Sequence, residues 1–316
     1  MKTTFTLIFL CTYLLISAQT KDSAHIIKAY AFYDEGKYDS ALYEINHVLA
    51  KDSTNPDYFD LSANLHFMLG NLKMAIWDCS KAIQLAPHDH LYYGHRAFYF
   101  YSLKMPDNAI RDNDSALKYS GKNDTLICNN LLDRGNAKKM KRDFQGAYED
   151  YLDIYKRDSL NYSSLISLGA VLDDLGKNKE AIQYLKKAIS LRPDLKEGWG
   201  NLGFRYLDEE NYEKALELFN KVLELEPEDP LGFNNRGFAK YKLKNYEGAL
   251  IDINKSIKIY PTNSFAYKNR ALVYLSLKEY KRACDDLAKA KELGFTQQYG
   301  EEVEELIKKN CIKNRL

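Results

Sequence analysis

The chain has few of the residues from which catalytic and metal sites are commonly built. It contains six histidines and five cysteines among 316 residues, and no two cysteines form a Cys-x-x-Cys pair. It also lacks the glycine-rich nucleotide fingerprint and the Gly-x-Ser-x-Gly turn of serine hydrolases. The formal net charge is only +1. The sequence therefore lacks the basic excess expected of a protein that binds nucleic acid or an anionic membrane surface.

One local concentration of possible metal ligands exists, and it is weak. His88, His90 and His95 lie close together beside Asp89, and three imidazoles can bind zinc. However, His88 and His90 fall in a predicted loop and lack the i, i+4 spacing of a helical metal site. We therefore expect neither a metal nor another cofactor, and a metal-dependent enzyme is the least favoured alternative.

Long apolar runs are missing after the first 18 residues. Before that point, Lys2 is followed by a nearly continuous apolar run over Phe5–Ile16 and by the small residues Ser17 and Ala18. This order is typical of a secretory signal peptide, whereas a membrane-spanning helix needs about 20 apolar residues. We expect cleavage after Ala18, with a retained anchor as the alternative. The mature chain should then have no transmembrane span and should be exported to the periplasm, the cell envelope or the medium.

What the sequence does contain is a repeat of 34 residues, present in eight copies between Asp22 and Gln297. Position 20 of every copy is alanine, and position 8 is small in the clearest copies. Successive alanines are 34 residues apart, except for one interval of 38 that marks an insertion near Asp124–Ile127. Such a period is typical of a stacked helical array rather than of one globular core. The alanines are Ala41, Ala75, Ala109, Ala147, Ala181, Ala215, Ala249 and Ala283.

Each copy divides into two amphipathic helices separated by a short polar turn. In the copy that starts at Lys196, apolar residues recur at helical spacing from Trp199 to Tyr206 and again from Tyr212 to Leu223. Small residues at positions 8 and 20 allow the paired helices to approach closely. A proline at position 32 ends the second helix in several copies, because proline cannot continue helical hydrogen bonding. These prolines are Pro87, Pro193, Pro227 and Pro261.

The pattern Trp199-x-x-Leu202-Gly203-x-x-Tyr206, followed by Ala215, Phe219 and Pro227, resembles the tetratricopeptide repeat family. Equivalent residues occur in the other copies in the same register. The resemblance implies an all-α fold, a right-handed superhelical solenoid of about eight antiparallel helix pairs. A last helix with one apolar and one polar face should cap this stack, because terminal repeats need a polar outer face.

These patterns predict the organisation of the whole chain. We expect a signal peptide at 1–18, repeats 1–3 at 22–123, the insertion at 124–127, repeats 4–8 at 128–297 and the capping helix at 298–313. The boundary near 120–127 should be either a bend or an ordinary longer loop. The chain also resembles envelope proteins of Gram-negative bacteria, and its signal-peptide ending and its cysteine-containing tail suggest the Bacteroidota.

Opposite charges occur together at positions 7 and 23 of the same copies, with one exception, Asp78 opposite Ser62. The copies that start at Tyr162 and Lys196 carry neither charge. This joint presence predicts an ion pair between the two helices of a repeat, partly buried because position 7 lies on the inner side of the first helix. A ligand-binding role for these charges is the alternative. The predicted pairs are Arg96–Asp112, Arg134–Asp150, Arg236–Asp252, Arg270–Asp286 and Lys28–Glu44.

Four cysteines follow the signal peptide. Cys284 should lie near the start of the last second helix and Cys311 near the end of the cap, and antiparallel packing brings these ends together. Because an exported protein meets oxidising conditions, we expect a disulfide between them. Cys79 occupies a position that is normally apolar and should be buried. Cys128, two repeats further on, should not reach it.

The family resemblance implies a concave face lined by the first helices. Position 6 on this face is Asn201, Asn235 and Asn269 in the last three copies. An amide side chain can donate to a backbone carbonyl and accept from a backbone N–H, so this series suits an extended peptide. Phe204, Phe238 and Tyr241 lie beside the asparagines and would add apolar contact. The alternative is that asparagine is a consensus choice that favours solubility.

The concave positions carry more acidic than basic residues, which favours a basic protein or peptide partner, although a solvated acidic face is an equal alternative. We therefore expect a non-enzymatic scaffold. Docking of the convex face into an envelope complex is the second hypothesis. The acidic positions are Asp34, Asp57, Asp60, Asp133, Asp173, Asp174, Glu197 and Asp208, and the basic ones are Lys139, Lys242 and Lys268.

Overall fold

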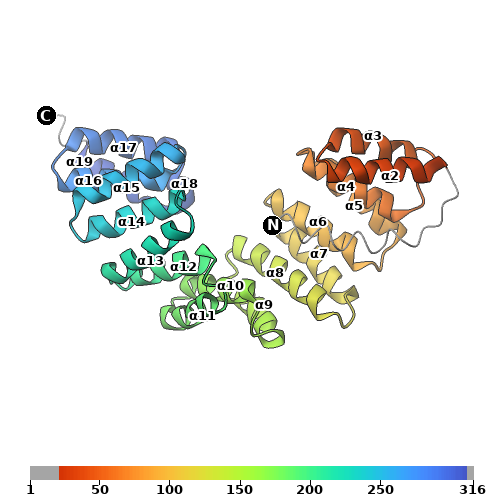
Figure 1. The fold of residues 1–316 in the computed structure, drawn as a ribbon, viewed down its shortest axis with the longest axis horizontal. Coiled ribbons are helices and arrows are strands. Elements are labelled where there is room, and N and C mark those ends of the chain that lie inside the picture. The colour runs from red at the N-terminus through yellow and green to blue at the C-terminus, as the bar shows by residue number, and fades with distance from the viewer. Residues whose placement is uncertain (1–20, 312–316) are drawn as a thin grey trace. The chain divides into compact units, whose positions relative to one another are not determined.

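The computed structural model describes residues 21–311, and over this range it contains helices and turns but no β-strand (Figure 1). The chain divides into two compact units, whose described parts are residues 21–153 (unit 1) and 154–311 (unit 2). The expected signal peptide at 1–18 lies outside the described residues. The prediction of an all-α fold built from helix pairs with a C-terminal helix is confirmed.

The helices alternate as first and second members of each repeat. Unit 1 contains α2 (Lys21–Asp34), α3 (Tyr38–Leu49), α4 (Pro56–Met68), α5 (Leu72–Leu85), α6 (His90–Ser102), α7 (Pro106–Tyr119) and α8 (Asp124–Met140). Helix α9 (Phe144–Arg157) contains the boundary between the units. Unit 2 contains α10 (Tyr162–Asp174), α11 (Asn178–Leu191), α12 (Lys196–Asp208), α13 (Tyr212–Leu225), α14 (Pro230–Lys242), α15 (Tyr246–Ile259), α16 (Ser264–Ser276), α17 (Tyr280–Glu292), α18 (Phe295–Tyr299) and α19 (Glu302–Asn310).

Small residues set the distance between the two helices of a repeat. All eight position-20 alanines are completely buried. At position 8, a Cβ atom built on Gly203 would lie 2.6 Å from the ring of Phe219, and one built on Gly169 would lie 2.5 Å from Leu185. A side chain at either glycine would therefore force the facing Phe219 or Leu185 side chain to move.

Most first helices begin directly after an asparagine or aspartate. The side chain of this residue accepts a hydrogen bond from a backbone N–H of the first turn, which would otherwise have no partner. Leu195 precedes α12 and forms no such bond. The capping residues are Asn55, Asp89, Asn123, Asn161, Asp229 and Asn263.

The turn inside each repeat always contains a left-handed residue at position 15. Three of these residues are glycines, and five are charged residues that carry a Cβ atom. A left-handed backbone costs a residue with a Cβ atom roughly 1–2 kcal/mol. The repeat geometry therefore imposes this conformation even where the local sequence disfavours it. The residues are Gly36, Gly70, Lys104, Arg142, Gly176, Glu210, Lys244 and Lys278.

The insertion at 124–127 differs from the expected loop. Helix α8 begins at Asp124 and has 17 residues, whereas the other first helices have 13 or 14. The Asn123 side chain accepts a hydrogen bond from the Leu126 backbone N–H, which fixes the start of this longer helix. The four extra residues therefore form an additional helical turn.

The C-terminal cap also differs from the expected single helix over 298–313. It consists of α18 and α19, separated by Gly300 with φ +97°. Phe295 and Val303 are buried and pack on Ala283, Leu287 and Ala290 of the last repeat. None of the helices described between residues 21 and 311 combines the length and apolarity needed to cross a membrane.

Candidate functional site

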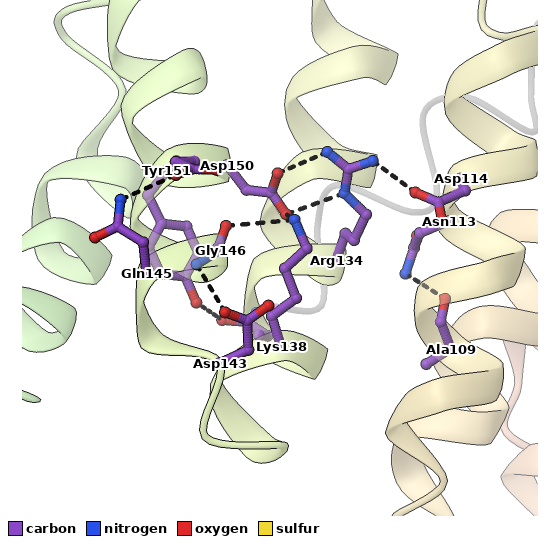
Figure 2. Close-up of polar contacts among 12 residues, drawn as sticks. Ala109, Asn113, Asp114, Arg134, Lys138, Asp143, Gln145, Gly146, Asp150 and Tyr151 are labelled. Atoms are coloured by element: carbon purple, nitrogen blue, oxygen red, sulfur yellow. Dashed lines mark hydrogen bonds and ion pairs between the residues drawn. The ribbon is translucent and has the colours of Figure 1, made fainter.

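Four arginines at position 7 pair with the position-23 aspartates of their own repeats. Arg96 donates from Nε and Nη2 to the two Asp112 oxygens at 2.7 and 2.8 Å. Figure 2 shows the same arrangement for Arg134 on α8 and Asp150 on α9, at 3.0 and 2.6 Å. Each aspartate is buried, so its charge is compensated inside the protein. The other two pairs, Arg236–Asp252 and Arg270–Asp286, have the same two-bond geometry.

Each of these arginines also binds a second residue, which the sequence did not lead us to expect. The remaining nitrogen, Nη1, donates to a position-25 side chain on the second helix of the preceding repeat. The acceptors are Ser80 for Arg96, Asp114 for Arg134, Asn220 for Arg236 and Asn254 for Arg270. Figure 2 shows Arg134 between Asp150 and Asp114.

The signal for this third bond was present in the sequence. Where the following copy has leucine at position 7, position 25 is Leu152 or Lys186. Neither of these side chains can accept a hydrogen bond. The acceptor at position 25 is therefore absent in the two copies that precede a leucine at position 7.

The first two repeats use other partners. Glu44 contacts Nδ1 of His25 at 2.5 Å, and Lys28 is exposed and pairs with no residue in the described range. In the second repeat the Ser62 hydroxyl donates to Asp78 at 2.7 Å. These contacts replace the arginine-aspartate pairs of the later repeats.

A disulfide joins Cys284 at the start of α17 to Cys311 at the end of α19. The two Cα atoms lie 5.7 Å apart. Cys79 and Cys128 are buried, and neither takes part in a disulfide between residues 21 and 311. The disulfide therefore holds the last described helix against the final repeat.

The structure places the three position-6 asparagines in different environments. Asn269 is only 4% exposed, and its Nδ2 donates to Oδ1 of Asn234 at 3.0 Å. Asn234 in turn donates from Nδ2 to Oδ1 of Asn235 at 3.1 Å. The Nδ2 group of Asn235, and the whole amide of Asn201, bind no residue within 21–311, and both side chains are partly exposed. Two of the three asparagines therefore offer hydrogen-bonding groups to a partner.

The three aromatic residues beside the asparagines are not equally accessible. Phe204 is 40% exposed, and its ring lies 5.8 Å from that of Phe219. The rings of Phe238 and Tyr241 lie 5.9 Å apart. The Phe238 ring also lies 5.6 Å from Nζ of the buried Lys268, which pairs with Glu302 of the cap. Phe204 therefore offers the most accessible apolar surface next to Asn201.

Several acidic residues of the first helices are paired within the protein. The Tyr92 hydroxyl donates to Asp57 at 2.6 Å, and Nδ1 of His95 lies 2.7 Å from Asp60. Burial disfavours a charged His95, but the Asp60 carboxylate outweighs this effect, so the pKa of His95 is raised. In unit 2, Arg205 pairs with Asp173 and Asp208. Asp60, Asp173 and Asp208 are thus each paired with a basic side chain.

Asp133 on α8 is an exception. It is partly buried, and it forms no hydrogen bond or ion pair with any residue of the described range. Burial raises the pKa of its carboxyl group to about 6. At neutral pH it is therefore a poorly solvated anion that no cation between residues 21 and 311 compensates.

The three clustered histidines do not converge on a common point. His95 contacts Asp60, the His88 ring lies 5.1 Å from the Tyr119 ring, and Nδ1 of His90 lies 3.5 Å from Asp89. No group of three potential metal ligands was found between residues 21 and 311.

Comparison with known proteins identifies the repeat. Residues 162–195 and 253–285 match family profiles described as tetratricopeptide repeat, and residues 203–244 match one described as TPR repeat. These matches support assignment to the tetratricopeptide repeat family. A tetratricopeptide repeat fold suggests a scaffold for protein–protein interaction.

Known tetratricopeptide repeat proteins share this fold at low sequence identity. The chain is similar to a tetratricopeptide repeat protein from Parabacteroides merdae ATCC 43184, with a TM-score of 0.67 and 19% identity over 80% of this chain and 97% of that one. It is also similar to the APC/C hetero-tetramer Cut9–Hcn1, with a TM-score of 0.66 and 16% identity over 96% of this chain and 58% of that one. Human Tetratricopeptide repeat protein 13 is 23% identical over 166 residues, 52% of this chain. That match spans only 15% of the human protein.

Proposed function

We propose that this protein is an exported, non-enzymatic scaffold that binds a protein or an extended peptide on the surface of its first helices. The observation that carries the proposal is the pair Asn201 and Asn235. These asparagines occupy the same position in successive repeats, and each keeps amide groups that no residue between 21 and 311 uses. A peptide can therefore bond to both without breaking a contact inside the protein.

Main-chain recognition explains why amides suit this surface. The Nδ2 group donates to a peptide carbonyl, and the Oδ1 atom of Asn201 accepts from a peptide N–H. Phe204, at 40% exposure, adds apolar contact beside Asn201. Binding of this kind grips an extended backbone with little selection among its side chains.

Export is part of the proposal because of residues 1–18, which have the order of a secretory signal. The disulfide between Cys284 and Cys311 supports it, since disulfides persist mainly in oxidising compartments. We place the mature protein in the periplasm or cell envelope, or outside the cell.

Affinity capture from an envelope extract tests the binding surface. The mature wild-type chain is compared with Asn201→Ala/Asn235→Ala, and captured proteins are identified by mass spectrometry. Asn108→Ala on α7 is the control, because it removes an amide from a second helix. We expect a partner that the wild type and the control retain and the double variant loses, with circular dichroism unchanged. Equal capture by all three would contradict binding through these asparagines.

An exposed apolar surface on second helices favours the alternative of docking into an envelope complex. Tyr43 on α3 is 62% exposed, and Met74 and Trp77 on α5 are 46% and 51% exposed. Large exposed apolar residues on neighbouring helices commonly mark interaction sites. If Tyr43→Ser/Trp77→Ser abolishes capture while Asn201→Ala/Asn235→Ala does not, the second-helix surface is the docking site.

A further inference from the structure

Successive first helices are joined by side chains at positions 5 and 6. In unit 1, Asp60 of α4 contacts His95 of α6, and in unit 2, Asn234 of α14 accepts from Asn269 of α16. Both contacts link residues 35 apart, from position 5 of one repeat to position 6 of the next. In other pairs of successive first helices, position 5 of the first should therefore lie opposite position 6 of the second.

Between α6 and α8 the corresponding contact cannot form, because the residue at position 5 of α6 has no side chain. Position 5 is Gly94, and position 6 of the next repeat is Asp133, once the four-residue insertion is counted. A Cβ atom built on Gly94 would meet only Oδ1 of Asn130, at 3.4 Å. By contrast, a Cβ atom built on Gly135 would lie 2.5 Å from the Tyr151 ring. A Cβ atom at Gly135 would thus force the Tyr151 ring to move, whereas Gly94 has only the Asn130 amide oxygen nearby and leaves space beside it.

Exposed apolar residues flank this space. Leu91 and Phe98 lie three residues before and four residues after Gly94, so all three share one face of α6. Leu91 is 46% exposed and Phe98 is 44% exposed. The surface of α6 therefore offers two apolar side chains with a gap between them, and the register places the Asp133 carboxylate opposite that gap.

Basic side chains of α6 and α8 are engaged by other residues. Arg96 binds Asp112 and Ser80, Arg134 binds Asp150 and Asp114, and His95 faces Asp60. Lys138, one turn beyond Arg134, pairs with Asp150 at 2.8 Å. Asp133 is therefore a partly buried anion with no ion-pair partner between residues 21 and 311. A cation from another molecule would supply the missing counter-charge.

We propose that Leu91, Gly94, Phe98 and Asp133 form a subsite for a lysine or arginine side chain of the protein partner. The aliphatic stem lies across Gly94 between Leu91 and Phe98, and the cation donates to the Asp133 carboxylate. The Phe98 ring adds an attraction for the cation. The inference rests on the proposed function only in assigning this side chain to a protein partner, because the subsite shares no residue with the asparagine surface of unit 2.

Short peptides test the subsite directly. The probe is acetyl-Ala-Lys-Ala-amide, with the norleucine analogue as a neutral match, titrated into the mature chain (residues 19–316). Carboxyl ¹³C NMR reports on Asp133, whose signal is assigned by its loss in Asp133→Asn. We expect saturable binding of the lysine peptide, a fall in the pKa of Asp133 on binding, and about tenfold weaker binding of the norleucine peptide.

Three variants complete the test. Asp133→Asn and Gly94→Leu should each weaken binding of the lysine peptide by about tenfold, the first by removing the charge and the second by filling the gap. Asp39→Asn, which removes the same charge from α3, should bind as the wild type does. Asp133→Asn removes a poorly solvated anion, so we expect it to fold.

Two results would overturn the subsite. One is equal affinity of the lysine and norleucine peptides for the wild type, and the other is unchanged affinity in Asp133→Asn. Neither affects capture through Asn201 and Asn235. Conversely, if the asparagine variant captured the same partner as the wild type, binding of the lysine peptide at Asp133 would not be affected. The two proposals can therefore fail independently.

Discussion

Asp114 lies on the second helix of the third repeat, and its Oδ1 atom accepts a hydrogen bond from Nη1 of Arg134 in the fourth repeat at 2.6 Å. Because Arg134 also holds Asp150 in its own repeat, one guanidinium joins three helices. Arginine suits this role because its planar group presents several donors in a fixed arrangement. The ion pairs thus stabilise the stacking of repeats as well as the repeats themselves.

Replacing both partners of an ion pair should cost less than replacing one. We expect Asp286→Leu to lower the free energy of unfolding by about 2–4 kcal/mol, because it leaves Arg270 without its counter-charge in a partly buried place. The double variant Arg270→Leu/Asp286→Leu should recover most of this loss, since Leu202 and Leu218 occupy the same positions in the sixth repeat. Urea unfolding of both single variants and the double variant measures the coupling. A double variant as unstable as the two single losses added together would contradict the pairing.

Glycine at position 15 should stabilise the protein. Glu210 and Lys244 adopt φ values of +56° and +61°. Replacing either by glycine removes the strain of the left-handed backbone but adds freedom to the unfolded chain, for a net gain of about 0.5–1 kcal/mol. The reverse change, Gly176→Ala, should cost about 1 kcal/mol. Thermal unfolding of the three variants tests the sign of each effect.

The contact between His95 and Asp60 should stabilise unit 1 more in acid than in base. The folded-state pKa of His95 is raised. Its contribution is therefore fully present below the unfolded pKa, near 6.5, and is lost as pH rises through the folded value. We expect His95→Gln to destabilise the protein more at pH 5.5 than at pH 9. A loss that is the same at both pH values would show that the imidazole acts only through packing.

Asp133 should have the opposite dependence on pH. Its pKa rises from 3.8 to about 6, roughly two units, so burial of the anion costs up to about 3 kcal/mol before solvent is considered. This cost is absent below the unfolded pKa, grows between pH 4 and 6, and stays constant above. Asp133→Asn should therefore stabilise the chain by about 1–3 kcal/mol at pH 8 and hardly at all at pH 3.5. Unfolding at the two pH values gives the comparison.

Loss of the disulfide should loosen the cap. The two cysteines are 27 residues apart, and closing a loop of this size stabilises a protein by about 3 kcal/mol. In Cys284→Ser/Cys311→Ser we expect faster amide hydrogen exchange in α19, with exchange in α12 and α13 unchanged. Uniformly faster exchange would mean that the bond supports the whole array.

The repeat itself could be predicted because its signals are local and periodic. Alanine at position 20 is required where two helices approach closely, and proline at position 32 ends the second helix. Ala215 and Pro227 therefore fix the register of their copy without a structure. Position 7 could be paired with position 23 because the two vary together within one copy. The bond from Arg96 to Ser80 was missed because its signal lies in two different copies.

The finer features depend on contacts between repeats, which a single copy does not encode. Asn269 has the same position in its repeat as Asn201. However, its Nδ2 group donates a hydrogen bond to Asn234 in the preceding repeat, which leaves that group unavailable to a partner. The residues after Asn123 are as compatible with a loop as with a helical turn, and capping by Asn123 favours the helix. Gly300 divides the cap because its backbone is left-handed, at φ +97°, a conformation that the surrounding apolar pattern does not reveal.

Each arginine bonds to side chains on two other helices, one of them in the preceding repeat. The segment that contains all of these bonds therefore differs from the repeat as defined by its first helix. The frame that begins with a first helix, residues 264–297, holds Arg270 and Asp286 but leaves the Asn254 acceptor in the preceding copy. A frame of the same length beginning at Asn254 contains the arginine and all its acceptors. Gene duplication or an engineered insertion that follows the second frame would add a repeat with its bonds intact. A duplication or insertion that follows the first frame would leave the arginine to bond with the position-25 side chain of a new preceding repeat.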